Sequence, residues 1–193
     1  MIDEATLNQG PGGLEPADGG WFVVNVADTA WLTHHAFGAG CVFENRGNVQ
    51  FPEVGINISV VEPGQPLCLY HEESMQEDFL MLAGEAVLLV NEEERPLRAW
   101  DFFHCPAGTE HVIVGAGNEP AIVLAVGARQ EEGTIRYPKS ELAAKYDASA
   151  DEETPNPDEA YARFQRPEPG RPSYWDELPW AGRQMTARRS VKA

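Results

Sequence analysis

The sequence is poor in basic residues: 14 Lys and Arg stand against 31 Asp and Glu among 193 residues, a formal net charge of −17. A surface of this sign repels phosphate backbones and anionic lipid headgroups, so we expect neither nucleic acid nor a membrane as a partner. Long hydrophobic runs are also missing, since no stretch approaches the roughly 20 apolar residues that span a bilayer. Residues 1–20 lack the basic and apolar regions of a signal peptide. These absences predict a cytoplasmic protein.

Cysteine is scarce as well. Cys41, Cys68 and Cys105 are an odd number and include no C-x-x-C pair. This count excludes a disulfide framework and a zinc ribbon, and it suits a reducing compartment. We interpret each cysteine as a small buried hydrophobic residue.

Strand-like segments dominate the middle of the chain. Before residue 130, short runs of β-branched and aromatic residues alternate with turns of Gly, Pro and Asn, and no βαβ alternation appears. This pattern is typical of an antiparallel sandwich or barrel, an all-β fold. We expect residues 21–26 to form a strand and residues 30–37 to form one or two helical turns.

The chain divides into three parts by composition. Residues 1–20 are rich in glycine and are predicted to be a flexible N-terminal arm. Residues 21–130 hold the predicted barrel. Residues 131–193 are predicted to be an extension that packs on this barrel or on a partner subunit and is frayed at its end. Its helical candidates are residues 138–146, with Ser140 as a cap, and residues 158–164.

Potential metal ligands gather around the central strands. His71, Glu73 and Glu77 precede the apolar run 79–82, and His111 leads into the apolar run 112–114. Ligands at the ends of two apolar strands would lie at the mouth of a buried cavity. The alternative is a solvated acidic rim, because acidic residues cluster in this region.

The spacing of these residues has a known counterpart. The pattern H-x-E-x3-E-x6-G followed by P-x-G-x2-H resembles the two motifs of the cupin superfamily, usually H-x-H-x3-4-E-x6-G and G-x5-P-x-G-x2-H-x3-N. The residues that carry it are His71, Glu73, Glu77, Gly84, Pro106, Gly108 and His111. The chain departs from the family at Glu73, which replaces a histidine, at Trp100, which replaces a glycine, and at Gly115, which replaces an asparagine. The resemblance implies a double-stranded β-helix, the cupin or jelly-roll barrel.

The resemblance also implies a mononuclear metal site. His71, Glu77 and His111 carry over as ligands, and Glu73 is an optional fourth ligand. Two imidazoles and one carboxylate on one side of an ion are typical of non-haem Fe(II), whereas a second carboxylate favours Mn²⁺ or Fe²⁺. The expected cofactor is therefore one divalent transition metal, and Fe, Mn, Ni and Zn remain open.

Further residues are assigned around this site. Phe79, Met81, Phe103 and Ile113 are interpreted first as core residues of the barrel and second as the lining of a pocket, and Leu69 is assigned to the same lining. His104, Gln76 and Tyr70 are candidates to support the ligands or contact a substrate. His34 and His35 are interpreted as surface or packing residues.

These assignments leave two functions open. The leading hypothesis is a small-molecule dioxygenase, or a related metal-dependent lyase or isomerase. The alternative is a non-catalytic cupin that binds a metal or a small ligand, and a purely structural barrel is a third reading. Strands that are apolar on both faces, together with the aromatic proline-rich segment 166–180, predict a homodimer.

Overall fold

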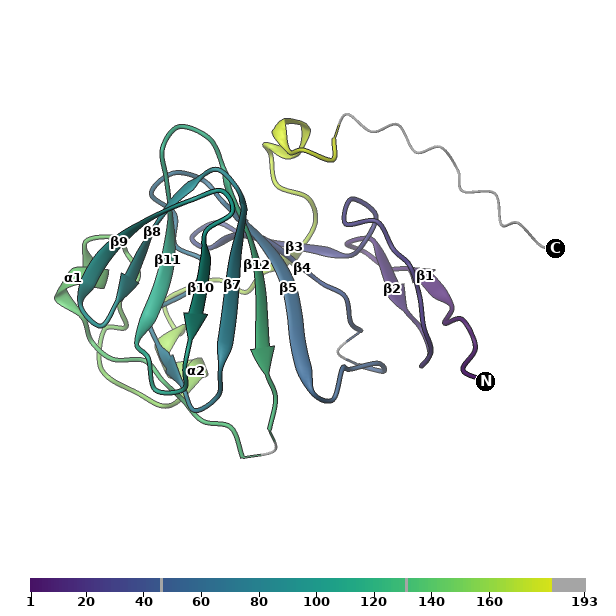
Figure 1. Cartoon of the computed structure of the whole chain (residues 1–193), viewed down its shortest axis with the longest axis horizontal. Coiled ribbons are helices and arrows are strands. Elements are labelled where there is room, and N and C mark those ends of the chain that lie inside the picture. The colour runs from purple at the N-terminus through teal and green to yellow at the C-terminus, as the bar shows by residue number, and fades with distance from the viewer. Residues whose placement is uncertain (46, 131, 182–193) are drawn as a thin grey trace.

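The computed structural model describes residues 1–45, 47–130 and 132–181, and two antiparallel β-sheets packed face to face form its centre (Figure 1). The larger sheet contains, in spatial order, β10 (Phe102–Cys105), β7 (Glu77–Ala83), β12 (Ala121–Ala128), β5 (Val54–Val61), β4 (Gly38–Val42), β3 (Trp31–His34) and β14 (Glu168–Pro169). The smaller sheet contains β11 (His111–Ala116), β8 (Glu85–Val90) and β9 (Glu93–Arg98). The predicted antiparallel all-β architecture is confirmed.

Two short ribbons and three short helices complete the fold of the described residues. β6 (Glu72–Glu73) pairs with β13 (Ile135–Arg136), and β1 (Leu7–Gln9) pairs with β2 (Leu14–Pro16). The helices are α1 (Glu141–Ala144), α2 (Pro157–Ala160) and the 3₁₀ helix η1 (Trp175–Glu177). Among the residues that the structure describes, no helix is both long and apolar enough to cross a membrane.

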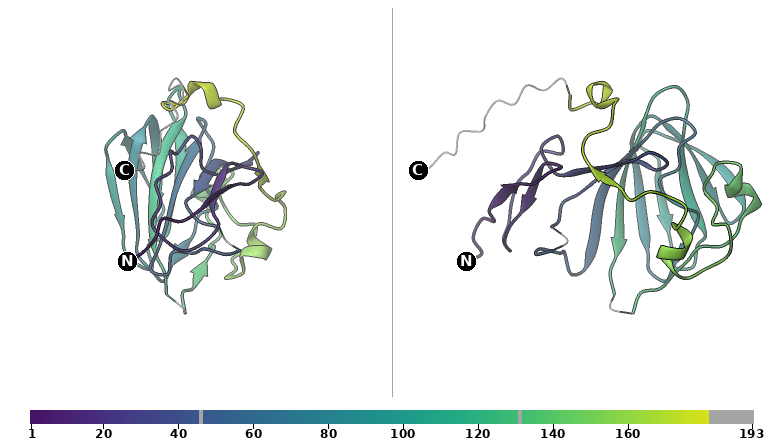
Figure 2. Two further views of the ribbon diagram at one scale, coloured as in Figure 1. Left: turned by 90° about the vertical axis from the view of Figure 1, so that its right-hand side faces the viewer. Right: turned by 180° about the vertical axis from the view of Figure 1, so that it is seen from behind.

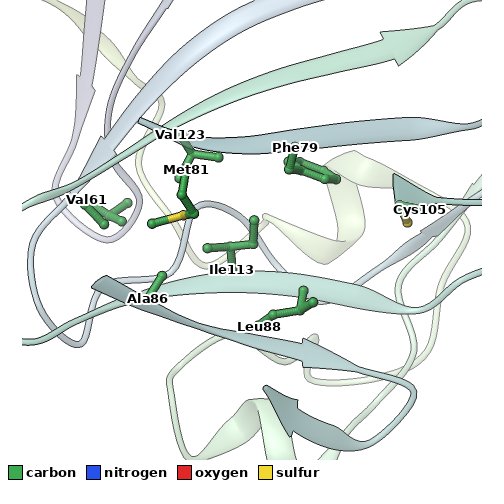
Figure 3. Close-up of a cluster of buried hydrophobic side chains, with 9 residues drawn as sticks. Val61, Phe79, Met81, Ala86, Leu88, Cys105, Ile113 and Val123 are labelled. Carbon is green, nitrogen blue, oxygen red and sulfur yellow. The ribbon is translucent and has the colours of Figure 1, made fainter. Parts of the chain in front are cut away.

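Alternation along the strands fills the space between the sheets. Successive side chains of a strand point to opposite faces, so Phe79 and Met81 of β7 face inward while Leu80 and Leu82 face outward. The inward residues meet Leu88 and Ile113 from the smaller sheet in one buried cluster (Figure 3). This cluster is the hydrophobic core, and the candidate site lies beside it.

The C-terminal extension covers part of the outer face of the larger sheet. Trp31 is fully buried there beneath Tyr174 and Leu178. Its ring lies 5.3 Å from that of Trp175, and the Tyr174 hydroxyl donates to the Val60 carbonyl at 3.2 Å. The extension was predicted to pack on its own barrel or on a partner subunit, and its described residues pack on their own barrel. Residues 182–193, predicted to be frayed, lie outside the described residues.

The helices of the extension are shorter than expected. α1 covers four residues of the predicted 138–146, and the Ser140 side chain accepts a hydrogen bond from the Ala143 N–H, as its proposed capping role requires. α2 begins at Pro157 behind the cap Asn156, close to the predicted 158–164. Both lie near the C-terminal end of the chain, as the sequence predicted.

The N-terminal region differs from its sequence expectation. Residues 1–20 contain the β1–β2 hairpin, which lies beside β3 at one end of the molecule (Figure 2). The strand predicted at residues 21–26 is wrong, because only Trp21 makes an isolated bridge there. The helical turns predicted at residues 30–37 are also wrong, because this segment begins with β3, which pairs with β4. Pairing between strands outweighed the local propensity.

Candidate metal centre

Two histidines are placed side by side by backbone pairing. His71 and His111 form an antiparallel bridge in which the His71 N–H donates to the His111 carbonyl at 3.1 Å and the His111 N–H donates to the His71 carbonyl at 2.8 Å. Their ring centroids are 4.8 Å apart, and both residues are buried. The bridge fixes the relative position of the two imidazoles without any bound ion.

The third group comes from the other sheet. Glu77 begins β7 in the larger sheet, and its Oε2 lies 3.3 Å from His111 Nε2 and 3.7 Å from His71 Nε2. One donor atom from each of the three residues lies within 4.8 Å of the others. The predicted trio therefore converges on one point between the two sheets.

The donor atoms fit a cation. Glu77 Oε2 and His111 Nε2 are buried and have no hydrogen-bond partner among the described residues, an arrangement that is costly unless an ion or a proton occupies the space. On the far side of each ring, His71 Nδ1 lies 2.8 Å from the Leu69 carbonyl and His111 Nδ1 lies 3.0 Å from the Thr109 carbonyl. An Nδ1–H donated to a carbonyl leaves Nε2 free to bind a metal.

Sulfur atoms also contact the imidazoles. Cys68 Sγ lies 3.6 Å from His71 Nδ1, and Cys105 Sγ lies 3.3 Å from His111 Nδ1. All three cysteines are free thiols. The sequence treated them as simple buried residues, but two of them border the site. Cys68 lies outside any strand, so alternation could not place it, whereas Cys105 ends β10 opposite Glu77.

The charges of the trio are strongly coupled. Burial alone would raise the pKa of Glu77, but interactions with His111 and His71 lower it to about 2. Burial alone would lower the pKa of His111, but Cys105 and Glu77 raise it to about 9, and the pKa of His71 is also raised. A divalent cation at this point would replace protons on the two Nε2 atoms.

A large cavity adjoins the trio. Its volume is about 970 Å³, and His71, Glu77 and His111 all line it. Phe79 and Ile113 supply apolar wall next to them. A site of this size can take a small molecule at the same point as the metal.

Comparison with known proteins identifies the domain. Residues 57–127 match the family described as a cupin domain. This chain contains a cupin domain. No curated protein matches it by sequence.

Solved structures share the cupin fold. A sugar phosphate isomerase of the cupin superfamily from Silicibacter pomeroyi is 21% identical with a TM-score of 0.51, over 59% of this chain and 80% of that one. A protein from Acidithiobacillus ferrooxidans, described as a sugar phosphate isomerase, is 23% identical with a TM-score of 0.45, over 50% of this chain. This chain spans 64% of its length. A predicted oxalate decarboxylase from Thermotoga maritima is 21% identical with a TM-score of 0.47, over 56% of this chain and all of that one.

Glu73, the departure from the usual cupin motif, lies at the edge of the centre. Its Oε1 is 3.9 Å from His71 Nε2. Burial, followed by repulsion from Glu77, raises its pKa. A role for Glu73 as a fourth ligand stays a prediction.

One arginine holds the segments that carry both histidines. Arg136 on β13 contacts Glu72 Oε1 at 2.8 Å, Glu110 Oε1 at 2.7 Å and Glu153 Oε2 at 3.2 Å. Glu72 follows His71 in the chain, and Glu110 precedes His111. The guanidinium therefore reinforces the pairing of the two imidazoles through their neighbours.

Three residues assigned to the pocket lining do not line the cavity, and two of them, Met81 and Phe103, take the core position that was their first interpretation. Met81 is buried in the core cluster, and Phe103 packs against that cluster and stacks on Phe79 with centroids 5.7 Å apart. Leu69 is buried against Tyr137. Its predicted orientation assumed a strand, but residues 67–70 form no strand and the alternation does not extend to them.

The residues expected to support the ligands make other contacts. His104 Nδ1 lies 2.7 Å from Asp78 Oδ1, and the Gln76 amide donates to Asp78 Oδ2 at 2.6 Å, both on the exposed outer side of the sheet. Tyr70 is buried, and its hydroxyl donates to Glu110 Oε2 at 3.3 Å. Tyr70 therefore supports the neighbour of a histidine, and the other two belong to the surface.

Sequence reasoning missed the aromatic part of the cavity. His34 and Phe37, from the β3–β4 hairpin, and Tyr161 and Phe164, from the segment after α2, all line it. The only signal in the sequence was the unusual aromatic content of the proline-rich extension. Nothing in the spacing linked these residues to the metal motif.

Proposed function

We propose that the cupin domain binds one divalent transition metal through His71, Glu77 and His111 and catalyses a reaction of a small molecule held in the adjoining cavity. Small-molecule dioxygenase chemistry, or a related metal-dependent reaction, is the class we favour. The observation that carries the proposal is the convergence of two imidazole nitrogens and one carboxylate oxygen at the end of a cavity of about 970 Å³. Two imidazoles and a carboxylate suit Fe, Mn, Ni or Zn and are typical of non-haem iron sites.

The residues of the chain have separate tasks in this proposal. A bound divalent metal would supply a Lewis acid with coordination positions open to a substrate. The Glu77 carboxylate would offset part of the charge of the metal, and the Leu69 and Thr109 carbonyls orient the imidazoles. Phe79 and its apolar neighbours keep bulk water from the reacting end of the cavity.

The alternative is a non-catalytic cupin that stores a metal or a small ligand. It would be favoured by a closed site in which Glu73 completes the coordination, and the 3.9 Å contact between Glu73 and His71 keeps this alternative open. The size of the cavity argues against a module that stores only a metal in a closed site, because such a module has no need of a ligand-sized space at the metal.

Elemental analysis separates the two. The wild type and the Glu73→Ala variant are purified without chelator or affinity metal, with His111→Ala as the control for loss of a ligand. We expect near-stoichiometric redox-active metal in the wild type and in Glu73→Ala, and little in His111→Ala. Zinc that is bound only when Glu73 is present would support the binding module. Equal metal content in His111→Ala would refute the ligand assignment.

A further inference from the structure

Four rings form a continuous surface where the cavity reaches solvent, and we call His34, Phe37, Tyr161 and Phe164 the aromatic collar. The Phe37 centroid lies 4.7 Å from His34, 4.7 Å from Phe164 and 5.4 Å from Tyr161. All four residues line the same cavity as the metal trio. The collar lies outside the matched cupin domain of residues 57–127, so it is a feature of the flanking segments.

The collar is fixed to the metal centre. The Tyr161 hydroxyl accepts a hydrogen bond from the Leu69 N–H at 3.0 Å, two residues before His71. The Tyr161 ring lies 5.5 Å from Tyr137, whose ring lies 5.9 Å from His71. Aromatic contacts therefore run from the mouth of the cavity to a metal ligand, and the position of the collar is set relative to the ion.

The polar edges of the collar are already occupied. His34 Nε2 lies 2.7 Å from the Gln165 carbonyl, and its Nδ1 accepts from the Ala36 N–H at 3.0 Å. Both ring nitrogens of His34 are engaged by the backbone, and its ring stacks on His35 with centroids 4.7 Å apart, so His34 contributes ring surface to the collar and no free hydrogen-bonding group. The Arg163 guanidinium lies over the Phe164 ring, 4.7 Å from its centroid. The rest of the collar's ring surface is flat and apolar, and such a surface prefers to pack against another flat apolar group.

Small and neutral residues make up much of the remaining lining. Gly38, Gly40 and Ala125 leave room beside the collar, and Asn57 and Ser59 add uncharged polar groups. Arg166, at the exposed end, is the single Lys or Arg in the lining that the structure describes. Tight binding of a phosphate relies on several charge-assisted donors, and this lining offers few.

We propose that the aromatic collar selects a small molecule with a planar apolar ring, which directs an oxygen-donor group to the metal end of the cavity. This inference rests on the proposed function, because the oxygen donors need the ion. Phe37 and Phe164 determine the specificity, and Tyr161 holds the collar in place. A sugar phosphate, which is polar throughout and doubly charged, does not match this surface.

Two hydroxy acids with the same chelating group test the inference. Lactate carries a methyl group where mandelate carries a phenyl ring, so their difference in affinity reports the contribution of the ring. Binding of each to the Zn²⁺-loaded protein is measured by titration calorimetry. We expect mandelate to bind about tenfold more tightly than lactate, because its ring buries more apolar surface.

Variants locate the effect. Phe37→Leu and Phe164→Leu keep apolar volume but lose the flat ring, and we expect each to reduce the mandelate-to-lactate ratio severalfold while lactate affinity is unchanged. Phe102→Leu is the matched control, because Phe102 is an exposed phenylalanine on the outer face of the sheet, and it should leave the ratio unaltered.

The possible failures are distinguishable. Stoichiometric Zn²⁺ with equal affinities for the two acids would overturn the collar and leave the metal site intact. Failure to retain Zn²⁺ would overturn the metal site and the inference with it. Glucose 6-phosphate binding more tightly than mandelate, with loss of that binding in Arg166→Ala, would replace the planar ligand by a phosphate.

Discussion

Removal of one buried hydroxyl tests how firmly the C-terminal extension is joined to the metal centre. In Tyr161→Phe the ring remains, but the Leu69 N–H loses the acceptor that it contacts at 3.0 Å. Leu69 is fully buried, so water cannot easily replace the hydroxyl. Leaving a buried donor unpaired costs about 1–3 kcal/mol of unfolding free energy.

Tyr146→Phe is the matched control. The Tyr146 hydroxyl donates a hydrogen bond to Glu94 Oε1 at 2.8 Å on the exposed surface. Water replaces that bond, and we expect a change within about 0.5 kcal/mol. Urea unfolding followed by tryptophan fluorescence measures both variants. Equal effects of the two substitutions would refute the reasoning, because they would show that the Leu69 N–H does not depend on Tyr161.

Three further results are expected. Leu178→Ala should lower the unfolding free energy by about 2–4 kcal/mol, because this side chain of the proline-rich segment is buried against Trp31 and its neighbours on the larger sheet, whereas Glu177→Ala on the exposed side should change it little. Equal urea midpoints would contradict docking of the segment. The affinity for Zn²⁺ should rise between about pH 6 and pH 8, by about tenfold per pH unit for each proton that the metal displaces, because the pKa of His111 is about 9. Glu77, with a pKa of about 2, is already deprotonated in this range and adds nothing to the slope. A flat profile in competition titrations would show that no proton leaves. Gly38→Ala should destabilise the fold by at least about 1 kcal/mol in thermal unfolding, because φ is +71° and the added Cβ would lie 2.2 Å from a backbone carbonyl oxygen; an unchanged Tm would show that the hairpin adjusts.

The metal trio was predictable because its geometry depends on strands. His71, Glu77 and His111 follow the spacing of a known motif, and backbone pairing brings them together whatever the rest of the chain does. His104 and Gln76 were placed near the ligands by sequence distance alone. The structure puts both on the outer side of the sheet, where Asp78 is their partner.

The collar was not predictable for a physical reason. Tyr161 and Phe164 follow a helix of four residues in an extension without regular periodicity, so no pattern indicates which surface they cover. Their position depends on tertiary contacts such as the bond from the Leu69 N–H to Tyr161. The predicted helical turns at residues 30–37 failed likewise, because pairing of β3 with β4 decides the structure there.

The predicted homodimer remains a prediction. The proline-rich segment covers part of the apolar outer face within one chain, which removes one of its two supports. Trp100 and Phe102 remain 74% and 64% exposed. Sedimentation equilibrium at micromolar concentration is the direct measurement, and a monomer there would remove the prediction.

The placement of the ligands on different layers has a mechanical consequence. Glu77 belongs to the larger sheet, while His111 belongs to the smaller one, and no strand pair joins these two sheets among the described residues. A bound ion would act as a further cross-link between two layers that otherwise meet through side-chain packing and the turns that connect their strands. Chelation would then weaken the whole sandwich as well as empty the site. Amide exchange along β11 would report such loosening at a distance from the ligands themselves.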